Sequence, residues 1–91
     1  MIKDIKVTLN HVDKIKKFTD INEKSQCDVR VFITDDVTIS GDSVMGIFAM
    51  DLTSPFRVQI EAESEENVQK LLARYSENNI PFKEGLKREL K

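Results

Sequence analysis

Four segments of the chain alternate apolar and polar residues, with the period of two that is typical of a strand with one buried face. The alternation is clearest near the start, where Ile5, Val7 and Leu9 are separated by polar residues. The other three segments are residues 28–33, 37–40 and 56–62. Because residues 34–36 (Thr-Asp-Asp) tolerate turn conformations, we expect the second and third strands to form a hairpin.

Three further segments show the three- and four-residue apolar spacing of a helix. The apolar positions are Ile15, Phe18 and Ile21, bordered by Asn22, in the first; Val44, Met45, Ile47, Phe48 and Met50 in the second; and Val68, Leu71, Leu72 and Tyr75 in the third. We expect Asn10 or Asp13 to cap the first helix, Asp42 or Ser43 the second, and Ser64 the third. These side chains accept hydrogen bonds from backbone N–H groups that have no partner in the first turn.

The predicted order is β-α-β-β-α-β-α. It indicates an α+β fold, an open-faced sandwich in which three helices cover one face of a four-stranded antiparallel sheet. Residues 1–76 are expected to form this domain. Residues 77–91 are a C-terminal extension that either docks as an extra turn, through residues such as Ile80 and Phe82, or forms a flexible tail.

Composition narrows the class of protein. Of the 91 residues, 40% are hydrophobic and 33% charged, and no apolar stretch approaches the ~20 residues that span a bilayer. The first residues, MIKDIKVTL, lack the apolar segment of a signal peptide. A lone cysteine, Cys27, excludes an intrachain disulfide and favours a reducing compartment. We therefore expect a cytoplasmic protein that does not insert into membranes.

Charge and residue counts also limit the chemistry. The net charge of −2 does not favour nucleic acid as a partner. One histidine and one cysteine exclude the usual zinc clusters, so no metal is expected. Three glycines do not make a phosphate-binding loop, and no catalytic triad is recognisable. We expect no cofactor and no self-contained catalytic site, and nothing in the sequence fixes an oligomeric state.

The only histidine, His11, lies where the first strand gives way to the first helix. A histidine at a helix start can be a phosphoryl acceptor, a metal ligand or a polar surface residue. An imidazole titrates near neutral pH, and backbone N–H groups at a helix N-terminus can hold phosphoryl oxygens.

The segment SVMGIFAMDL, residues 43–52, resembles the regulatory-serine segment of HPr, the histidine phosphocarrier family of the bacterial sugar phosphotransferase system. Together with the element order, the resemblance covers residues 2–76. The segments KKF and GIFAMDL-x-x-P are similar to the corresponding segments of a divergent, clostridia-type branch of the family. Proteins of this branch lack the sequence motif around the phosphorylated histidine. The resemblance implies partners such as enzyme I, transporter domains, a serine kinase or a transcription regulator.

In the family, a histidine in the pattern Gly-aliphatic-His-x-Arg-Pro accepts the phosphoryl group from enzyme I. His11 lies at the matching place, but Leu9, Asp13 and Lys14 occupy the glycine, arginine and proline positions. An acidic side chain beside a phosphohistidine adds repulsion. One unit-charge contact at about 4 Å and an effective dielectric constant of ~20 amounts to about 4 kcal/mol. The resemblance thus implies weak or no phosphocarrier activity.

Ser43 matches the serine that a dedicated kinase phosphorylates in the family, and it is also an ordinary candidate for a helix cap. Val44, Met45 and Ile47 match a partner-binding surface. As packing, Ile47 and Phe48 are expected to cover the sheet and Val44 and Met45 to be exposed. The resulting prediction is a regulatory or docking module that acts through Ser43 and the helix after it. One alternative is an atypical phosphocarrier that uses His11. Another is a general small α/β interaction domain that resembles the family in its fold only.

Overall fold

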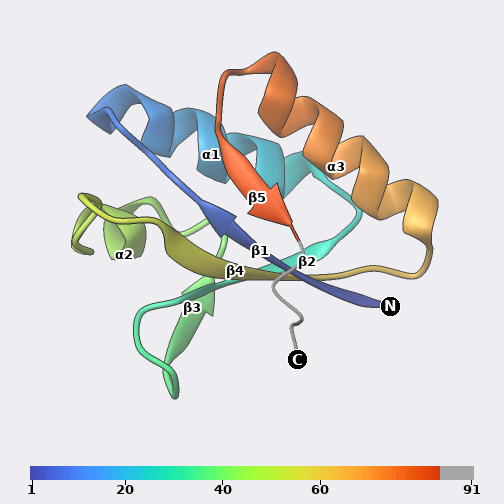
Figure 1. Cartoon of the computed structure of the whole chain (residues 1–91), viewed down its shortest axis with the longest axis horizontal. Helices are drawn as coiled ribbons and strands as arrows, with labels where there is room; N and C mark the ends of the chain where they lie inside the picture. Colours follow the sequence, from blue (N-terminus) through green and yellow to red (C-terminus); the bar gives the residue numbers. More distant parts are fainter. Residues whose placement is uncertain (85–91) are drawn as a thin grey trace.

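The computed structural model describes residues 1–84. Five strands form one antiparallel sheet in the order β3-β2-β4-β1-β5, and three helices accompany it (Figure 1). The elements are β1 (Ile2–Val7), α1 (Val12–Lys24), β2 (Asp28–Phe32), β3 (Thr38–Ser40), α2 (Val44–Phe48), β4 (Phe56–Glu61), α3 (Glu65–Glu77) and β5 (Phe82–Glu84). The predicted α+β class and antiparallel sheet are confirmed.

The predicted strand count of four is wrong, because residues after α3 add a fifth strand. The chain reverses at Asn79, whose φ of 58° is a left-handed conformation that asparagine tolerates. Ile80 is then buried, and β5 pairs with β1 so that Val7 lies opposite Phe82. Residues 77–84 therefore belong to the packed structure. The rest of the extension, residues 85–91, lies outside the described residues.

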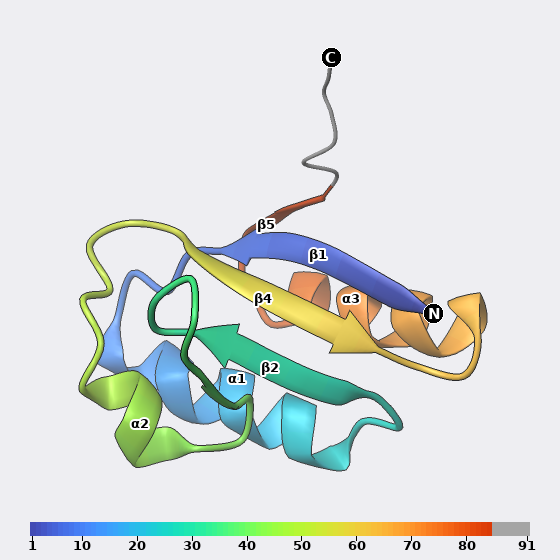
Figure 2. The ribbon, with the colours of Figure 1, turned by 90° about the horizontal axis from the view of Figure 1, so that it is seen from below.

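The sheet buries one face only. Ile5 and Val7 of β1 and Val58 and Ile60 of β4 are buried, whereas the residues between them are exposed or half-buried. The buried face packs against α1 and α3, and Figure 2 shows the helices on one side of the sheet. Residues that alternate with a period of two in the sequence therefore point alternately into the core and toward the open face of the sheet.

A row of aromatic rings links the sheet to both long helices. The ring of Phe18 on α1 lies 6.0 Å from Phe56 of β4 and 5.4 Å from Tyr75 of α3, measured between centroids. Tyr75 in turn lies 6.1 Å from Phe82 of β5. The ring of Phe18 is thus at the centre of the core, where aromatic pairs add to the stabilisation from buried area.

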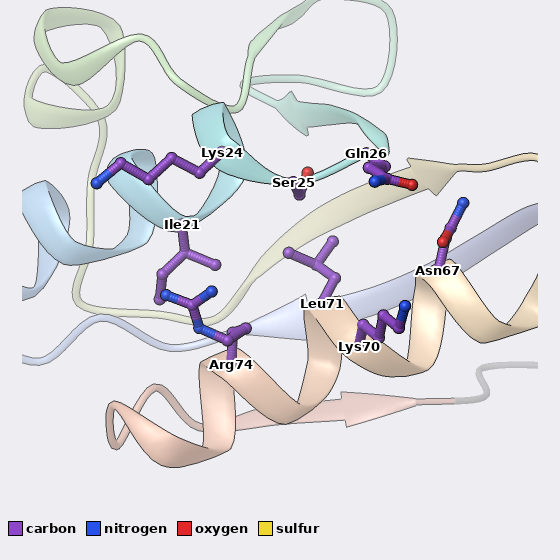
Figure 3. A pocket seen from close by; sticks show the side chains of 8 residues that line it. All are labelled: Ile21, Lys24, Ser25, Gln26, Asn67, Lys70, Leu71 and Arg74. Atoms are coloured by element: carbon purple, nitrogen blue, oxygen red, sulfur yellow. The ribbon is translucent and has the colours of Figure 1, made fainter.

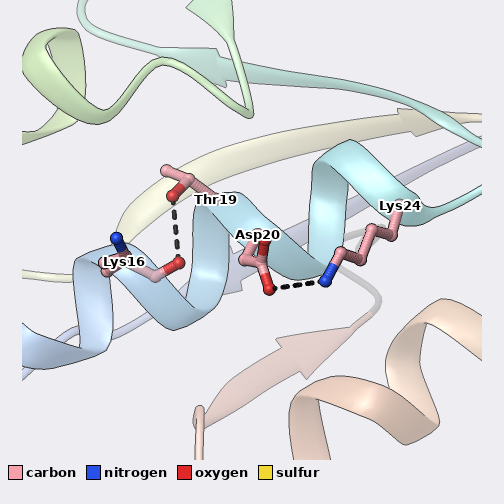
Figure 4. Close-up of polar contacts among 4 residues, drawn as sticks. All are labelled: Lys16, Thr19, Asp20 and Lys24. Atoms are coloured by element: carbon pink, nitrogen blue, oxygen red, sulfur yellow. Dashed lines mark hydrogen bonds and ion pairs between the residues drawn. The ribbon is translucent and has the colours of Figure 1, made fainter.

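Two side chains of α1, Thr19 and Asp20, have their partners on the helix itself. The hydroxyl of buried Thr19 donates to the carbonyl oxygen of Lys16 at 3.1 Å, and Lys24 pairs with Asp20 at 3.2 Å (Figure 4). The first contact removes the cost of burying an unpaired hydroxyl. The second is an exposed i,i+4 pair, which contributes only a few tenths of a kcal/mol. None of the helices in residues 1–84 is long and apolar enough to cross a membrane.

The predicted caps are confirmed for two helices and wrong for one. Ser64 accepts a hydrogen bond from the Asn67 N–H, and Ser43 accepts one from the Gly46 N–H, each at 3.2 Å. At α1, however, His11 occupies the capping position and its side chain makes no capping hydrogen bond. Neither Asn10 nor Asp13 takes that role.

Candidate functional site

His11 lies exposed at the N-terminus of α1. Its backbone is extended, with φ −136° and ψ 150°, and its carbonyl oxygen accepts a hydrogen bond from the Lys14 N–H at 3.0 Å. Among residues 1–84, no side chain or backbone group is hydrogen-bonded to the imidazole. The ring therefore stands beside the first turn of a 13-residue helix, where backbone N–H groups and the helix dipole favour an anion.

The neighbours of His11 do not form the clamp that the family pattern would supply. Asp13 is an exposed acid in the first turn of α1. Lys14 is directed elsewhere, because its Nζ donates to the carbonyl oxygen of Asn78 at 2.8 Å. That oxygen is at the C-terminal end of α3, where a cation is stabilised by the helix dipole. Lys14 thus joins two helices, and its ammonium group is already bound.

Ser43 is half-buried at the start of α2, where its Oγ caps the helix. Asp42 precedes it and accepts a hydrogen bond from the Ser40 hydroxyl at 2.6 Å. The local structure is a short loop of polar side chains between β3 and α2. A phosphoryl group on Ser43 would place about −1.5 to −2 charges next to the Asp42 carboxylate and the apolar surface of α2.

The helix after Ser43 presents apolar side chains to solvent. Met45 is 77% exposed, Phe48 55% and Val44 44%. The expectation that Phe48 packs in the core is wrong, and Ile47 is buried with no exposed area. Ile47 therefore belongs to the core and is removed from the candidate partner-binding residues. We call Val44, Met45 and Phe48 the α2 surface.

The two candidate sites lie at the same end of the molecule. The N-terminus of α1, with His11, and α2, with Ser43, are both at the left in Figures 1 and 2. Val12, the first residue of α1, is 66% exposed at this end as well. A partner that contacts the α2 surface would therefore approach the region of His11. Clusters of exposed apolar side chains are typical of protein interaction sites.

A buried polar network holds the loop before Ser43. The Tyr75 hydroxyl donates to Asn22 Oδ1, and Asn22 Nδ2 donates to the carbonyl oxygen of Gly41 at 2.8 Å. At Gly41 a Cβ atom would lie 2.6 Å from a methyl carbon of Val29, so the backbone approaches the sheet too closely for any other residue to fit unchanged. In the sequence, Asn22 borders the apolar stripe of the first predicted helix. An amide at such a position, next to buried apolar residues, is the signal for this network.

Burial also changes the ionisation of two groups near this network. Burial of the Tyr75 hydroxyl, aided by the nearby Cys27 thiol, raises its pKa well above the usual value, against the smaller lowering effect of the hydrogen bond to Asn22. Burial raises the pKa of the Cys27 thiol too. Each group therefore keeps its proton in the folded chain at a pH where the unfolded chain loses it.

We expect the folded protein to lose stability as the pH rises above about 10, the pKa of an unperturbed tyrosine. Above this pH the folded state keeps the Tyr75 proton that the unfolded state loses, so this one group lowers the free energy of unfolding by about 1.4 kcal/mol per pH unit. Tyr75 is the only tyrosine, so ultraviolet absorbance of tyrosinate reports its ionisation directly. The absorbance should appear together with loss of helical circular dichroism. Ionisation near pH 10 in a chain that stays folded would contradict a buried hydroxyl.

A groove lies between the C-terminal end of α1 and the side of α3 that faces it. Ile21 and Leu71 are its apolar residues, and Lys24, Lys70 and Arg74 are its cations (Figure 3). Each cation has a carboxylate on its own helix: Lys24 pairs with Asp20, Lys70 with Glu66 at 3.6 Å, and Arg74 with Glu77 at 4.0 Å. The charges of this groove are therefore balanced locally.

No group of three or more potential metal-binding side chains occurs among residues 1–84. In comparisons with known proteins, no protein-family model, no curated protein and no solved structure matches the chain.

Proposed function

We propose that the chain is an HPr-like protein of the phosphotransferase system that acts as a regulatory or docking module, with weak or no phosphocarrier activity. The observation that carries this proposal is the α2 surface, three exposed apolar side chains directly after a serine in the sequence context of a regulatory serine. The order of the first seven elements supports it, since it is the order expected for the family.

The surroundings of His11 argue against efficient phosphoryl transfer. A phosphohistidine needs a fixed cation to bind its oxygens, and a guanidinium fork does this better than a flexible ammonium group. Here the arginine position holds Asp13, and Lys14 is bound to Asn78. Phosphorylation at His11 would therefore bring two negative groups together without a cation already in place.

Phosphorylation at Ser43 would act on the docking surface itself. Ser43 immediately precedes Val44 and Met45, so a phosphate there changes the edge of the α2 surface from polar and neutral to strongly acidic. A partner that buries Met45 would then have to accommodate a desolvated dianion. We propose that this makes binding dependent on a serine kinase.

The alternative is an atypical phosphocarrier that accepts a phosphoryl group on His11 from enzyme I. It is favoured by the exposed imidazole at the N-terminus of α1, which has no hydrogen-bond partner within residues 1–84. The two functions differ in which residue carries the phosphoryl group and in its chemical stability, since phosphohistidine is acid-labile and phosphoserine is not.

The deciding experiment is intact mass spectrometry of the purified chain after two incubations. With phosphoenolpyruvate and enzyme I from the same organism, we expect no gain of a phosphoryl group, while a conventional HPr in the same tube gains one. With ATP and the kinase that phosphorylates HPr on serine, we expect one acid-stable phosphoryl group. It should be lost in Ser43→Ala and kept in Ser40→Ala. An acid-labile group lost in His11→Ala would overturn the docking function in favour of the phosphocarrier.

Partner binding is tested with a charge placed on the α2 surface. Met45→Lys should weaken binding to enzyme I or to a transporter domain at least about tenfold, because an ammonium group replaces a buried apolar contact. Ile2→Lys is the matched control, since Ile2 is 57% exposed but lies on β1. Titration calorimetry measures both. Equal affinities for the two variants would show that the α2 surface is not the docking site.

A further inference from the structure

Three cations lie in register across the open face of the sheet. Lys6 of β1 is directly opposite Arg57 of β4 on one side and directly opposite Lys83 of β5 on the other. Opposite residues in an antiparallel pair share a face, with Cβ atoms about 5 Å apart. We call Lys83, Lys6 and Arg57 the cation row, and it spans about 10 Å, two strand spacings.

The cation row is on the face of the sheet that the helices leave uncovered. Lys6 alternates with buried Ile5 and Val7, so its side chain points away from the core. Arg57 likewise alternates with Phe56 and Val58 on β4. In Figure 2 none of the helices formed by residues 1–84 lies on that side of the sheet. The row is therefore accessible to a ligand from solvent.

Only one of the three charges of the row, that of Arg57, is paired with a carboxylate among residues 1–84. Asp4 accepts hydrogen bonds from Nε and Nη2 of Arg57, each at 3.3 Å. Among residues 1–84, no carboxylate forms an ion pair with Lys6 or Lys83. Like charges directly opposite each other on a sheet are destabilising, and Lys6 has such a neighbour on both sides. The groove between α1 and α3 differs, because each of its cations has its own carboxylate.

Arg57 is also held in place by an aromatic ring. Its guanidinium carbon lies 4.1 Å from the centroid of the Phe32 ring on β2, a cation–π contact. Together with the two hydrogen bonds to Asp4, this contact fixes the arginine before any ligand arrives. A fixed guanidinium group loses little conformational entropy on binding an anion.

One end of the row opens into a hollow of about 430 Å³. Lys6, Phe32 and Arg57 contribute to it from the strands, and the loops around Ile33 and Met50 form its walls. Two loop carboxylates also line it: Asp35, and Asp51, which accepts hydrogen bonds from Thr53. The volume lies within the range of about 300–1,000 Å³ that is usual for small-ligand pockets.

We infer that the cation row and this hollow bind a small organic diphosphate. The phosphoryl groups lie along Lys83, Lys6 and Arg57, and the organic part lies in the hollow beside Phe32. Two adjacent phosphoryl groups match a row of cations in which, within residues 1–84, Arg57 has a carboxylate partner and the two lysines have none. This site is independent of the proposed function, because it involves neither His11 nor Ser43.

The first test is a backbone-amide NMR titration at low ionic strength with inorganic pyrophosphate and, separately, ADP. Shifts should concentrate on β1, β4 and β5, and ADP should bind more tightly than pyrophosphate. Lys6→Gln should weaken both about tenfold, the loss expected for one charge-assisted hydrogen bond. Lys70→Gln, the same charge change in the groove between α1 and α3, should leave both affinities within about twofold. Absence of binding at millimolar probe, or equal losses in the two variants, would overturn the site. Equal affinity for the two probes would overturn the role of the hollow.

A second measurement detects the unbalanced row without any ligand. Because Lys6→Gln removes both like-charge contacts, we expect the melting temperature of the free protein to rise by about 3 °C at low salt. The rise should disappear at about 1 M salt, where the screening length is ~3 Å. A lower melting temperature for the variant would show that the row is not strained, which contradicts the basis of the inference.

Discussion

Replacing Phe18 with alanine is expected to lower the free energy of unfolding by about 4 kcal/mol, the usual cost of removing a fully buried aromatic side chain. The Phe18 ring has no exposed area and contacts the rings of Phe56 and Tyr75. Its loss leaves a cavity between β4, α1 and α3 and removes two aromatic contacts. Since a domain of this size is stable by about 5–15 kcal/mol, the substitution removes between about a quarter and four fifths of the free energy of unfolding.

Urea denaturation followed by circular dichroism measures this change. Phe48→Ala is the matched control, because it removes the same side chain from the exposed α2 surface. We expect its effect to be within about 0.5 kcal/mol, as for other surface substitutions. A large loss of stability in Phe48→Ala would mean that α2 packs through both Ile47 and Phe48, as the sequence pattern predicted.

Asn22→Ala is expected to cost about 3 kcal/mol. Asn22 is buried and joins Tyr75 of α3 to Gly41 in the loop before α2. Truncation removes two hydrogen bonds and leaves a buried hydroxyl and a buried carbonyl oxygen without partners, each of which costs about 1–3 kcal/mol if water does not replace the amide. The loop that carries Ser43 should loosen as well, which faster amide hydrogen exchange at Asp42 and Ser43 would show.

Asn10→Ala serves as the control, because Asn10 is exposed at the other end of α1. A double-mutant cycle with Tyr75→Phe separates the network from general packing. We expect a coupling of about 1 kcal/mol, since the two residues share one hydrogen bond. Additive effects would contradict the bond between the Tyr75 hydroxyl and Asn22.

The central strands and the two long helices could be predicted from sequence because a strong period determines them. In β1 and β4, a buried residue alternates with a charged or polar one, and only one assignment puts Ile5 and Val7 of β1 on the same face as the apolar residues of β4. In α1 and α3, the spacing Ile15–Phe18–Ile21 and Val68–Leu71–Leu72–Tyr75 defines a single stripe. Patterns of this length contain enough apolar positions to distinguish the period of a strand from that of a helix.

Short elements could not be predicted in the same way. β5 has three residues, and Phe82 is its only residue packed against the core, so no alternation can be recognised. In α2, a spacing of three and four residues groups Val44 with Ile47 and Phe48. Neighbouring helical residues are about 100° apart, however, and in this five-residue helix only Ile47 reaches the core.

The position of the candidate site along the chain could be predicted from the sequence, but the contacts of its side chains could not. Ser43 as the cap of α2 follows from residue type, because serine caps are common. The contacts of His11 and Lys14 at the start of α1 do not follow from residue type. Lys14 binds the C-terminal end of α3, a helix more than fifty residues later in the chain. The same holds for the cation row, which only the strand register reveals.

The position of β1 in the sheet determines when the chain can fold during synthesis. Val7 of β1 pairs with Phe56 of β4 and with Phe82 of β5, so both partner strands are made about 50 residues or more after it. At about 5–20 residues per second, the ribosome takes roughly 3–10 s to reach β4. During this interval Ile5 and Val7 have no sheet to join, and the neighbouring charges of Lys3, Asp4 and Lys6 are of the kind that opposes aggregation of an exposed apolar segment.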